Sequence, residues 1–410
     1  MATTAATWTD VQIPASVYAI SIVFVQIFLS AIILAFSSPP KGLNLLHPRF
    51  LGFYVSLIFF WLETFYLPGI LSLQPGSTIQ DSTPMLHGFW LWKYLDDALL
   101  SQWSFEAAGP TSELGGLAIV PKNGKVVRVG DGWKGRLMFS FRVVSEARFI
   151  GTPWAPPGVP KRTVTGKWEW MGWNIGVALG YAFVRSTLER WLLGEYNPVV
   201  SLLGMVIGNE ELAYRVGTVM SYYAIIYVSL ELGYRSMGLI SVGLGITEAH
   251  EWFPLFGSVF EARGVRSFWG RFWHQLSRRI HSAPASFITY HVLRLPKKGS
   301  LVSRYTMTTL VFTSSGLWHL VGNLGSGIPF AKTGPMNYFC IQSLGIMLED
   351  GFQALVFPSE DDGRENKKSQ PGILMGIAGR LWLVLWLSFT TTPWMYPILE
   401  NQKMRFPNAY

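Results

Sequence analysis

Apolar stretches of about the length that crosses a lipid bilayer recur along the whole chain, and they constrain its fold more than any other feature. They cover residues 13–36, 51–71, 175–193, 214–232, 236–246, 305–324, 337–357 and 374–392. Inside a bilayer each backbone group must find its hydrogen-bond partner within the protein, so stretches of this kind fold as helices. We therefore predict an all-α polytopic membrane protein, a helical bundle of about seven to nine transmembrane spans.

The composition supports this fold class. Half of the 410 residues are hydrophobic and 14% are charged, whereas about a quarter of the residues of a soluble protein are charged. The mean hydropathy is +0.28. The net charge of +8 comes from basic residues between the spans, without a nucleic-acid-reading motif. It predicts contact with a lipid surface or a polyanionic cosubstrate, and no nucleic acid.

Several chemistries are excluded by the residues present. Cys340 is the single cysteine, so an intrachain disulfide, a CxxC redox pair and a cysteine-rich zinc site are all ruled out. The sequence has no Walker motif, no GxSxG elbow and no histidine pair at metal-ligand spacing. We expect no metal. The first apolar run, 17–36, lacks a basic region before it, so we expect a retained span and not a removed signal peptide.

The chain reads as a single membrane domain over 1–410, with a polar insertion at 72–167 that lies outside the membrane or along its interface. Within this insertion, 133–149 has apolar residues at helical spacing. The Gly-rich stretch 236–246 is short enough to be a half-helix or a re-entrant piece. Arg185 and Glu189 are four residues apart, which predicts a local ion pair on a helix.

Basic residues indicate the orientation, because lysine and arginine gather in cytosolic loops. Residues 248–300 carry three acidic residues and eight basic ones. The basic residues are Arg263, Arg266, Arg271, Arg278, Arg279, Arg294, Lys297 and Lys298. We expect this segment to face the cytosol. The loop with Lys41 and Arg49 shares that side in this prediction, and the first twelve residues lie opposite.

His319 is the first candidate for chemistry, because an ionisable side chain inside an apolar span is costly unless it has a function. Ser315 precedes it by four residues, which places both on one face of a helix. A neutral imidazole there can take a proton from an alcohol as a general base. The alternative is a histidine that only joins helices through a hydrogen bond.

The aromatic and basic segment 268–279 is the second candidate. If it is one helix, Arg271, His274 and Arg278 share a face, and Trp269 and Trp273 share a neighbouring one. Guanidinium groups in one row suit phosphate recognition, because their donors form a fixed fork. The alternative is that these arginines reach anionic lipid headgroups. The residues alone do not decide between the two.

The order and spacing of these residues resemble the signature of the wax synthase-like acyltransferases, which include fungal membrane O-acetyltransferases of secondary metabolism. The matching residues are Trp252-Phe253-Pro254-Leu255-Phe256-Gly257-Ser258, Arg266-Ser267-Phe268-Trp269-Gly270-Arg271-Phe272-Trp273-His274-Gln275, Lys297-Lys298-Gly299-Ser300 and Phe312-Thr313-Ser314-Ser315-Gly316-Leu317-Trp318-His319, with a partial match at Gly172-Trp173-Asn174. The resemblance covers about residues 168–349.

The resemblance implies the fold of membrane-bound O-acyltransferases, a helical bundle with a buried tunnel, and transfer of an acyl group from acyl-CoA to an alcohol. The essential histidine of that superfamily maps onto His319, and an Asn or His of its earlier motif maps onto His274. Acyl-CoA is then the cosubstrate, held through its phosphates by Arg271, Arg278 and Arg279 with Trp269 and Trp273 nearby. The expected location is multi-pass in the endoplasmic reticulum membrane, with the CoA side facing the cytosol.

The chain departs from the signature at two positions. Phe272 replaces its second arginine, and Trp318 is bulkier than the usual leucine and is expected to shape the acceptor pocket beside Ser315. By analogy with the fungal members, we expect acetyl-CoA as donor and a terpenoid or other small hydrophobic alcohol as acceptor.

Other functions remain open at this point. Within the same class, the alternative is a wax-ester synthase that joins a fatty acyl-CoA to a fatty alcohol. A membrane terpene cyclase would need paired carboxylates near membrane depth, and only Glu349 and Asp350 are adjacent there. A transporter would show inverted halves with broken helices in corresponding positions.

Overall fold

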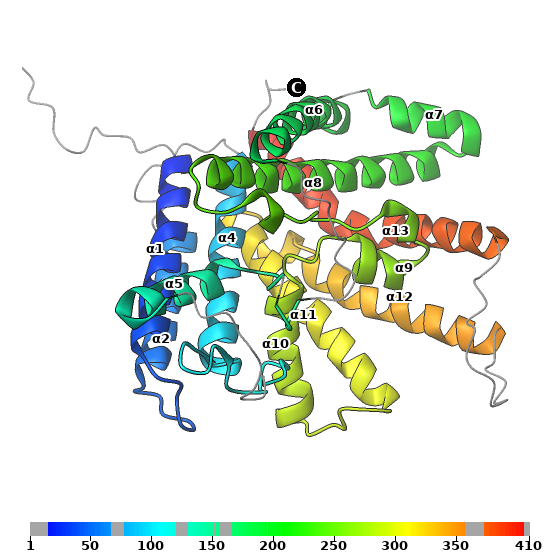
Figure 1. The fold of residues 1–410 in the computed structure, drawn as a ribbon. Helices are drawn as coiled ribbons and strands as arrows, with labels where there is room; N and C mark the ends of the chain where they lie inside the picture. Colours follow the sequence, from blue (N-terminus) through cyan, green and yellow to red (C-terminus); the bar gives the residue numbers. More distant parts are fainter. Residues whose placement is uncertain are drawn as a thin grey trace, which may run out of the picture. The chain divides into compact units, whose positions relative to one another are not determined.

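The structure is a computed structural model that describes residues 15–66, 78–119, 130–150, 152–155, 166–194, 196–356 and 373–405. These residues are mostly helical (Figure 1). The chain divides into two compact units. Unit 1 consists of Met1–Trp154 and Ser277–Cys340, and unit 2 consists of Ala155–Leu276 and Ile341–Tyr410.

Unit 1 is built around two helices that are distant in sequence, α4 and α11. Its helices are α1 (Ala15–Phe36), α2 (Pro48–Trp61), α4 (Thr78–Tyr94), α5 (Gly132–Ser145), α10 (Arg278–Ser286), α11 (Leu301–Gly325) and the first turns of α12 (Pro335–Val356). Helix α11 packs against α4 and α10, and α1 packs against α4 and α5. Short π-helical turns extend α2, α4 and α10 as Leu62–Tyr66, Leu95–Leu100 and Phe287–Val292.

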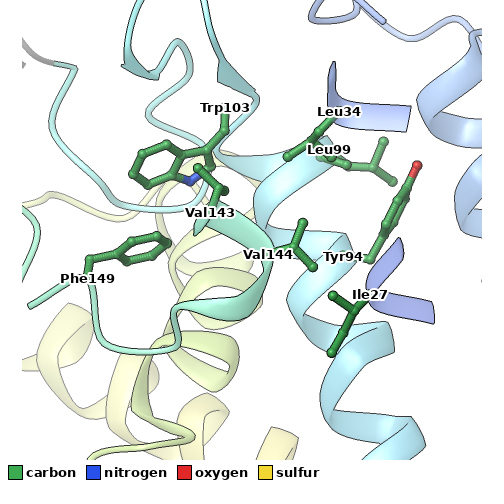
Figure 2. Packing of buried hydrophobic residues seen from close by; sticks show 9 residues of the cluster. Ile27, Leu34, Tyr94, Leu99, Trp103, Val143, Val144 and Phe149 are labelled. Atoms are coloured by element: carbon green, nitrogen blue, oxygen red, sulfur yellow. The ribbon is translucent and has the colours of Figure 1, made fainter. Parts of the chain in front are cut away.

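An aromatic and aliphatic core holds α1, α4 and α5 together (Figure 2). Trp103 and Phe149 stack with ring centroids 4.6 Å apart, and Val143 and Val144 pack beside them. Trp103 lies in a two-residue antiparallel hairpin, Trp103–Ser104 paired with Gly109–Pro110. The core thus fixes the end of α4 and the π-helical turn Leu95–Leu100 that follows it.

Unit 2 is organised on the long helix α8 (Glu210–Gly243), against which three other helices pack. These are α6 (Lys167–Leu193), α7 (Pro198–Ile207) and α13 (Ile373–Arg405). The remaining elements are three single turns, Ala249–Glu251, Val259–Glu261 and α9 (Val265–Ser267), the π-helical turn η6 (Phe268–Phe272) and the later part of α12. Asn197 and Asn209 cap the starts of α7 and α8 with their side chains, which is the usual role of asparagine there.

Two of the described helices are long and apolar enough to cross a membrane, Glu210–Gly243 and Leu374–Met404. Shorter apolar helices cover Ser21–Phe36 and Pro198–Ile207. The all-helical character of the prediction agrees with the described residues, and the number of seven to nine spans stays a prediction.

The structure differs from the sequence-based expectation in two places. Residues 236–243 are not a separate half-helix, because α8 continues through Glu231 and Arg235, whose side chains pair at 2.8 Å on one face. The 72–167 segment also contains the regular helix α4. Its charged residue Lys93 is fully buried, with Asp97 as partner.

Two local expectations are confirmed. Arg185 and Glu189 form the predicted ion pair on α6, with an N–O distance of 2.8 Å. The helical spacing seen at 133–149 corresponds to α5. Its position at a membrane interface stays a prediction.

Candidate functional site

The residues predicted for catalysis and cosubstrate binding fall into both units. Unit 1 holds Arg278, Arg279, Ser315, Trp318 and His319, and unit 2 holds Trp269, Arg271, Trp273 and His274. Each group has a defined setting within its own unit.

Residues 268–279 do not form the single helix that would place Arg271, His274 and Arg278 on one face. The turn η6 ends at Trp273, whose backbone is extended with ψ 147°, and α10 begins only at Arg278. The N–H of Trp273 bonds to the carbonyl of Phe268 at 2.7 Å, which closes a wide π-helical turn. Arg271, His274 and Arg278 therefore do not form a row on one helical face, and His274 lies in the link after the turn.

Gln275 stabilises the end of this turn. Its side-chain amide donates to the carbonyls of Trp273 at 2.7 Å and Trp269 at 3.3 Å. Carbonyls at a helix end have no partner within the helix, and a side-chain donor satisfies them. Gln275 thus has a structural reason to follow His274: it fixes the path of the backbone that carries the imidazole.

Gly257 locks the two halves of the motif against each other. Its N–H donates to the carbonyl of Phe272 at 2.9 Å. A Cβ at this position would lie 2.0 Å from the carbonyl oxygen of Arg271, which is far too short for two heavy atoms that are not bonded to each other. Only glycine lets the backbone of the 252–258 loop approach the 268–272 turn so closely.

The carboxylates Glu349 and Asp350 hold the start of the same segment. Glu349 accepts the backbone N–H groups of Val265 and Arg266, the latter at 2.9 Å, and the indole N–H of Trp382 at 3.0 Å. Asp350 pairs with the guanidinium of Arg266 through both oxygens. The two adjacent carboxylates considered for a cyclase thus serve to anchor residues 265–266.

His274 is partly buried beside aromatic rings. The ring centroid of Phe256 lies 5.6 Å away at 85°, and that of Trp273 lies 5.5 Å away. Trp273 is buried and itself packs on Phe268 and Tyr223 with centroids 5.2 and 5.3 Å away. The imidazole is therefore held by a rigid aromatic layer built from the motif and from α8.

Trp269 and Arg271 differ from each other in their surroundings. The indole N–H of Trp269 donates to Gln342, a fully buried side chain, at 3.3 Å. Arg271 is exposed, so its guanidinium can meet a ligand without first leaving the protein interior. Of the unit 2 residues predicted to bind CoA, Arg271 has the setting that fits an anion best.

His319 lies on α11 in unit 1, and its ring is partly exposed. It stacks on Phe339 with centroids 4.6 Å apart at 16°. The neighbouring Trp318 ring lies 5.1 Å away. The predicted helix of 305–324 is confirmed as α11, so Ser315 and His319 do share a face.

A buried polar network links Ser314 of α11 to Trp92 and His281. Ser314, next to the predicted Ser315, accepts the indole N–H of Trp92 at 3.0 Å and lies 3.0 Å from the Nδ1 of His281. His281 is 3% exposed, and its ring lies 5.4 Å from that of Trp318. The network joins α4, α10 and α11.

Arg279 is engaged by acidic and hydroxyl groups of unit 1. Its guanidinium makes two hydrogen bonds of 2.6 Å to Asp96 and one of 2.7 Å to Ser101. Asp96 is fully buried. A Cβ at Gly115 would lie 2.8 Å from both the arginine and the aspartate, so the backbone there closes the cluster. Arg278, by contrast, is exposed at the start of α10.

The Lys-Lys-Gly-Ser part of the motif immediately precedes α11. Ser300 is the N-cap, and its hydroxyl accepts the N–H of Ser303 at 3.2 Å. Gly299 has a φ of +74°, which favours glycine. These residues thereby set where α11 begins, and hence the turn of the helix that carries His319.

Asn174, from the partial upstream match, is buried between α6 and α8. Its amide donates to the carbonyl of Trp170 at 2.7 Å, and its Oδ1 accepts from Arg235 at 2.5 Å. Arg235 also pairs with Glu231. Beside them is a cavity of about 30 Å³, which also borders the 252–255 loop. It has room for about one water molecule, too little for a cosubstrate.

Sequence reasoning missed Asp96, His281 and the anchoring role of Glu349. The signal for Asp96 was a pair of adjacent acidic residues shortly after Trp-Lys-Tyr in the predicted polar insertion. His281 follows the Arg278-Arg279 pair closely, and these two charges are the more prominent feature of the sequence there. Among the described residues, no three His, Cys, Asp or Glu side chains form a group that could hold a metal ion.

Comparison with known proteins identifies relatives of this chain. The profile of the Membrane bound O-acyl transferase family matches residues 252–341, the part of the chain that contains His274, His281 and His319. Acetyltransferase fsoF of Humicola fuscoatra is 37% identical over 339 residues, which cover 76% of this chain and 81% of that protein. Acetyltransferase aurG of Calcarisporium arbuscula is 28% identical over 331 residues, which cover 77% and 78%.

Acetyltransferase ataH of Aspergillus terreus matches a shorter part, with 39% identity over 173 residues that cover 42% of this chain and 55% of that protein. No solved structure matches the chain. The relationship to fsoF extends over most of both chains, well beyond the matched profile. The chain therefore belongs to the membrane-bound O-acyltransferase family and is an acyltransferase enzyme.

Proposed function

We propose that this enzyme is an O-acetyltransferase that moves acetyl from acetyl-CoA to a hydroxyl group of a terpenoid or another small hydrophobic secondary metabolite. The observation that carries the proposal is His319, a partly exposed imidazole on α11 that stacks on Phe339 within the region that matches the family. The names of fsoF and aurG support acetyl as the transferred group.

His319 acts as the general base in this proposal. Its neutral ring takes the proton of the acceptor hydroxyl as the oxygen forms a bond to the thioester carbonyl. The carbon–sulfur bond then breaks, and the imidazolium returns the proton to the CoA thiolate. Proton transfer by a positioned side chain contributes about 10²- to 10⁴-fold to a rate, which sets the loss expected for His319→Ala.

His274 stabilises the negative charge on the carbonyl oxygen by a hydrogen bond from its ring. Removal of one such donor typically costs about 10²- to 10³-fold in kcat. The rigid setting between Phe256 and Trp273 supports this role, because a donor held in place loses no energy by reorganising during the reaction. Ser315 and Trp318 line the substrate pocket beside His319.

Arg271 and Arg278 bind the CoA phosphates from the cytosolic side, and Trp269 and Trp273 support the segment that presents Arg271. Both arginines are exposed, as phosphate contact requires. Arg279 already pairs with Asp96, so its contribution is to hold the start of α10 and thereby the direction of Arg278. The enzyme is multi-pass, with seven to nine spans, in the endoplasmic reticulum membrane.

The experiment uses membranes that contain the full chain, incubated with radiolabelled acetyl-CoA or palmitoyl-CoA and a panel of terpenoid and fatty alcohols. Label is expected in an ester of a terpenoid alcohol with acetyl-CoA only. His319→Ala should abolish it, whereas His250→Ala, an exposed histidine paired with Glu248, should not. Transfer from palmitoyl-CoA to a fatty alcohol would instead favour a wax-ester synthase, and full activity of the His319 variant would refute the assigned base.

A further inference from the structure

Two aromatic rings border the imidazole of His319 within unit 1. Phe339 stacks on it at 4.6 Å, and Trp318 lies 5.1 Å away with its ring tilted by 55°. The two rings come from different helices, α12 and α11. A group bound at His319 therefore meets a wall of the protein wherever it extends toward either ring.

The indole of Trp318 is fixed in one orientation. Its N–H donates to the carbonyl of Met85 on α4 at 2.8 Å. A Cβ at Gly88 would lie 2.8 Å from the Cδ1 and 2.9 Å from the Nε1 of this indole. The ring thus occupies the space that a side chain at 88 would need, and the glycine lets it rest directly on α4.

Two further rings lie near the indole. Phe89 and His281 lie 6.4 and 5.4 Å away, measured between ring centroids. His281 is itself held by Ser314. A tryptophan that is hydrogen-bonded, packed on a helix backbone and backed by two rings cannot swing away to make room, because protein interiors are close-packed.

We infer that Trp318 sets the length of the acyl group by closing the space beside His319 toward α4. The inference rests on the proposed function. The reacting carbonyl must come within hydrogen-bond reach of the hydroxyl that His319 activates. The methyl group of acetyl then fits, whereas a longer acyl chain that runs toward α4 meets the indole. One methylene too many in such a pocket lowers kcat/KM by about 10- to 200-fold.

The test compares kcat/KM for acetyl-, butyryl- and octanoyl-CoA in the wild type and in Trp318→Leu and Trp318→Phe, all as purified full-length enzyme in detergent. The wild type is expected to prefer acetyl-CoA over butyryl-CoA by at least about tenfold. In Trp318→Leu the octanoyl-to-acetyl ratio should rise by at least about tenfold, and Trp318→Phe should lie between.

Trp386 provides a matched control in unit 2. Its indole also packs on a helix glycine, since a Cβ at Gly345 would lie 2.7 Å from it, and its N–H also donates to a neighbour, Gln342, at 3.1 Å. Trp386→Leu should lower the yield of folded enzyme in the same way but leave the chain-length ratio unchanged.

The outcomes separate the two proposals. If the wild type transfers no acetyl group to any alcohol, the proposed function fails. If the wild type transfers acetyl and butyryl groups equally well, or folded Trp318→Leu keeps the wild-type ratio, the assignment of Trp318 is overturned while the function stands. If both Trp318 variants fail to fold, the acetyl-to-butyryl preference of the wild type still tests the assignment of Trp318.

Discussion

The backbone N–H of Gly257 donates to the carbonyl of Phe272 at 2.9 Å, and this bond joins the two parts of the motif. It brings the 252–258 loop onto the turn that precedes His274. The two backbones are so close that the hydrogen bond can form only because residue 257 has no side chain. The geometry of His274 thus rests on a residue that makes no contact with any reactant in the proposed mechanism.

Gly257→Ala should disrupt acyl transfer, because its Cβ would lie 2.0 Å from the carbonyl oxygen of Arg271. The loop and the turn must then move apart, and we expect activity to fall by at least about 10²-fold, as for a misplacement near 1 Å. Gly270→Ala is the control, since a Cβ at that position meets nothing within 4 Å. Activity assays on membranes with equal amounts of folded enzyme check this. Equal activities of the two variants would contradict the role given to Gly257.

Glu349→Ala should destabilise unit 2. The substitution leaves the N–H groups of Val265 and Arg266 and the indole of Trp382 without their acceptor. Each buried donor left without a partner costs about 1 to 3 kcal/mol. Thermal unfolding in detergent should show a clear loss. Glu211→Ala, an exposed glutamate in an ion pair of 3.2 Å, should unfold like the wild type. A small effect of Glu349→Ala would mean that residues 265–266 are held by other contacts.

The helices were predictable where one apolar stretch decides the outcome. The span expected at 305–324 is α11, Leu301–Gly325, because hydrophobic periodicity is a local property of the sequence. The helix α4 was missed for the same reason. Its polar residues look like loop residues until their partners are known, and those partners lie elsewhere in the fold.

The fine structure of the candidate site depends on contacts between distant residues. Val265 meets Glu349 across 84 positions, and Arg279 meets Asp96 across 183. No local pattern contains such pairs, so the break at Trp273 and the engagement of Arg279 could not be predicted. His319 was predicted because it is an ionisable residue in an apolar span, and His274 because of the aromatic and basic segment and its motif. Such patterns fix residue types and spacing but not surroundings.

Arg49 illustrates the limit of charge counting. It was counted as a loop charge that indicates orientation, yet it is fully buried. Its guanidinium donates to the carbonyls of Ser37 and Trp103 at 2.9 Å each. An arginine held in this way by main-chain oxygens joins α1, α2 and the hairpin. The predicted orientation therefore rests on the basic residues of 248–300, of which Arg263, Arg271, Arg278, Arg294, Lys297 and Lys298 are exposed.

Arg271→Ala and Arg279→Ala should fail in different ways. Arg271 is exposed, and loss of a phosphate contact should raise the KM for acetyl-CoA about tenfold, with less effect at high salt. Arg279→Ala leaves the buried Asp96 without its cationic partner, and breaking a buried ion pair destabilises a protein by about 3 to 5 kcal/mol. Steady-state kinetics and thermal unfolding of both variants check this. A folded Arg279→Ala with a raised KM would instead assign Arg279 to the phosphates.

Unit 2 offers two arginine–glutamate pairs with the same helical spacing and different burial. Glu231 and Arg235 on α8 pair at 2.8 Å with side chains 4% and 19% exposed. Arg185 and Glu189 on α6 also pair at 2.8 Å but are 27% and 23% exposed. Burial, and not geometry, is the main difference, so the pairs allow a direct measurement of what burial contributes.

Glu231→Met should destabilise unit 2 by about 3 to 5 kcal/mol. The substitution leaves the mostly buried guanidinium of Arg235 with a single hydrogen-bond acceptor, Asn174. The double variant Glu231→Met with Arg235→Met removes both charges and should be more stable than either single variant by at least about 1 kcal/mol. The same cycle on Arg185 and Glu189 should give a coupling of about 0.3 to 0.5 kcal/mol. Free energies of unfolding in detergent supply both cycles. Equal coupling in the two pairs would show that the interior beside Asn174 is as well hydrated as the surface of α6, and that the small cavity there admits water.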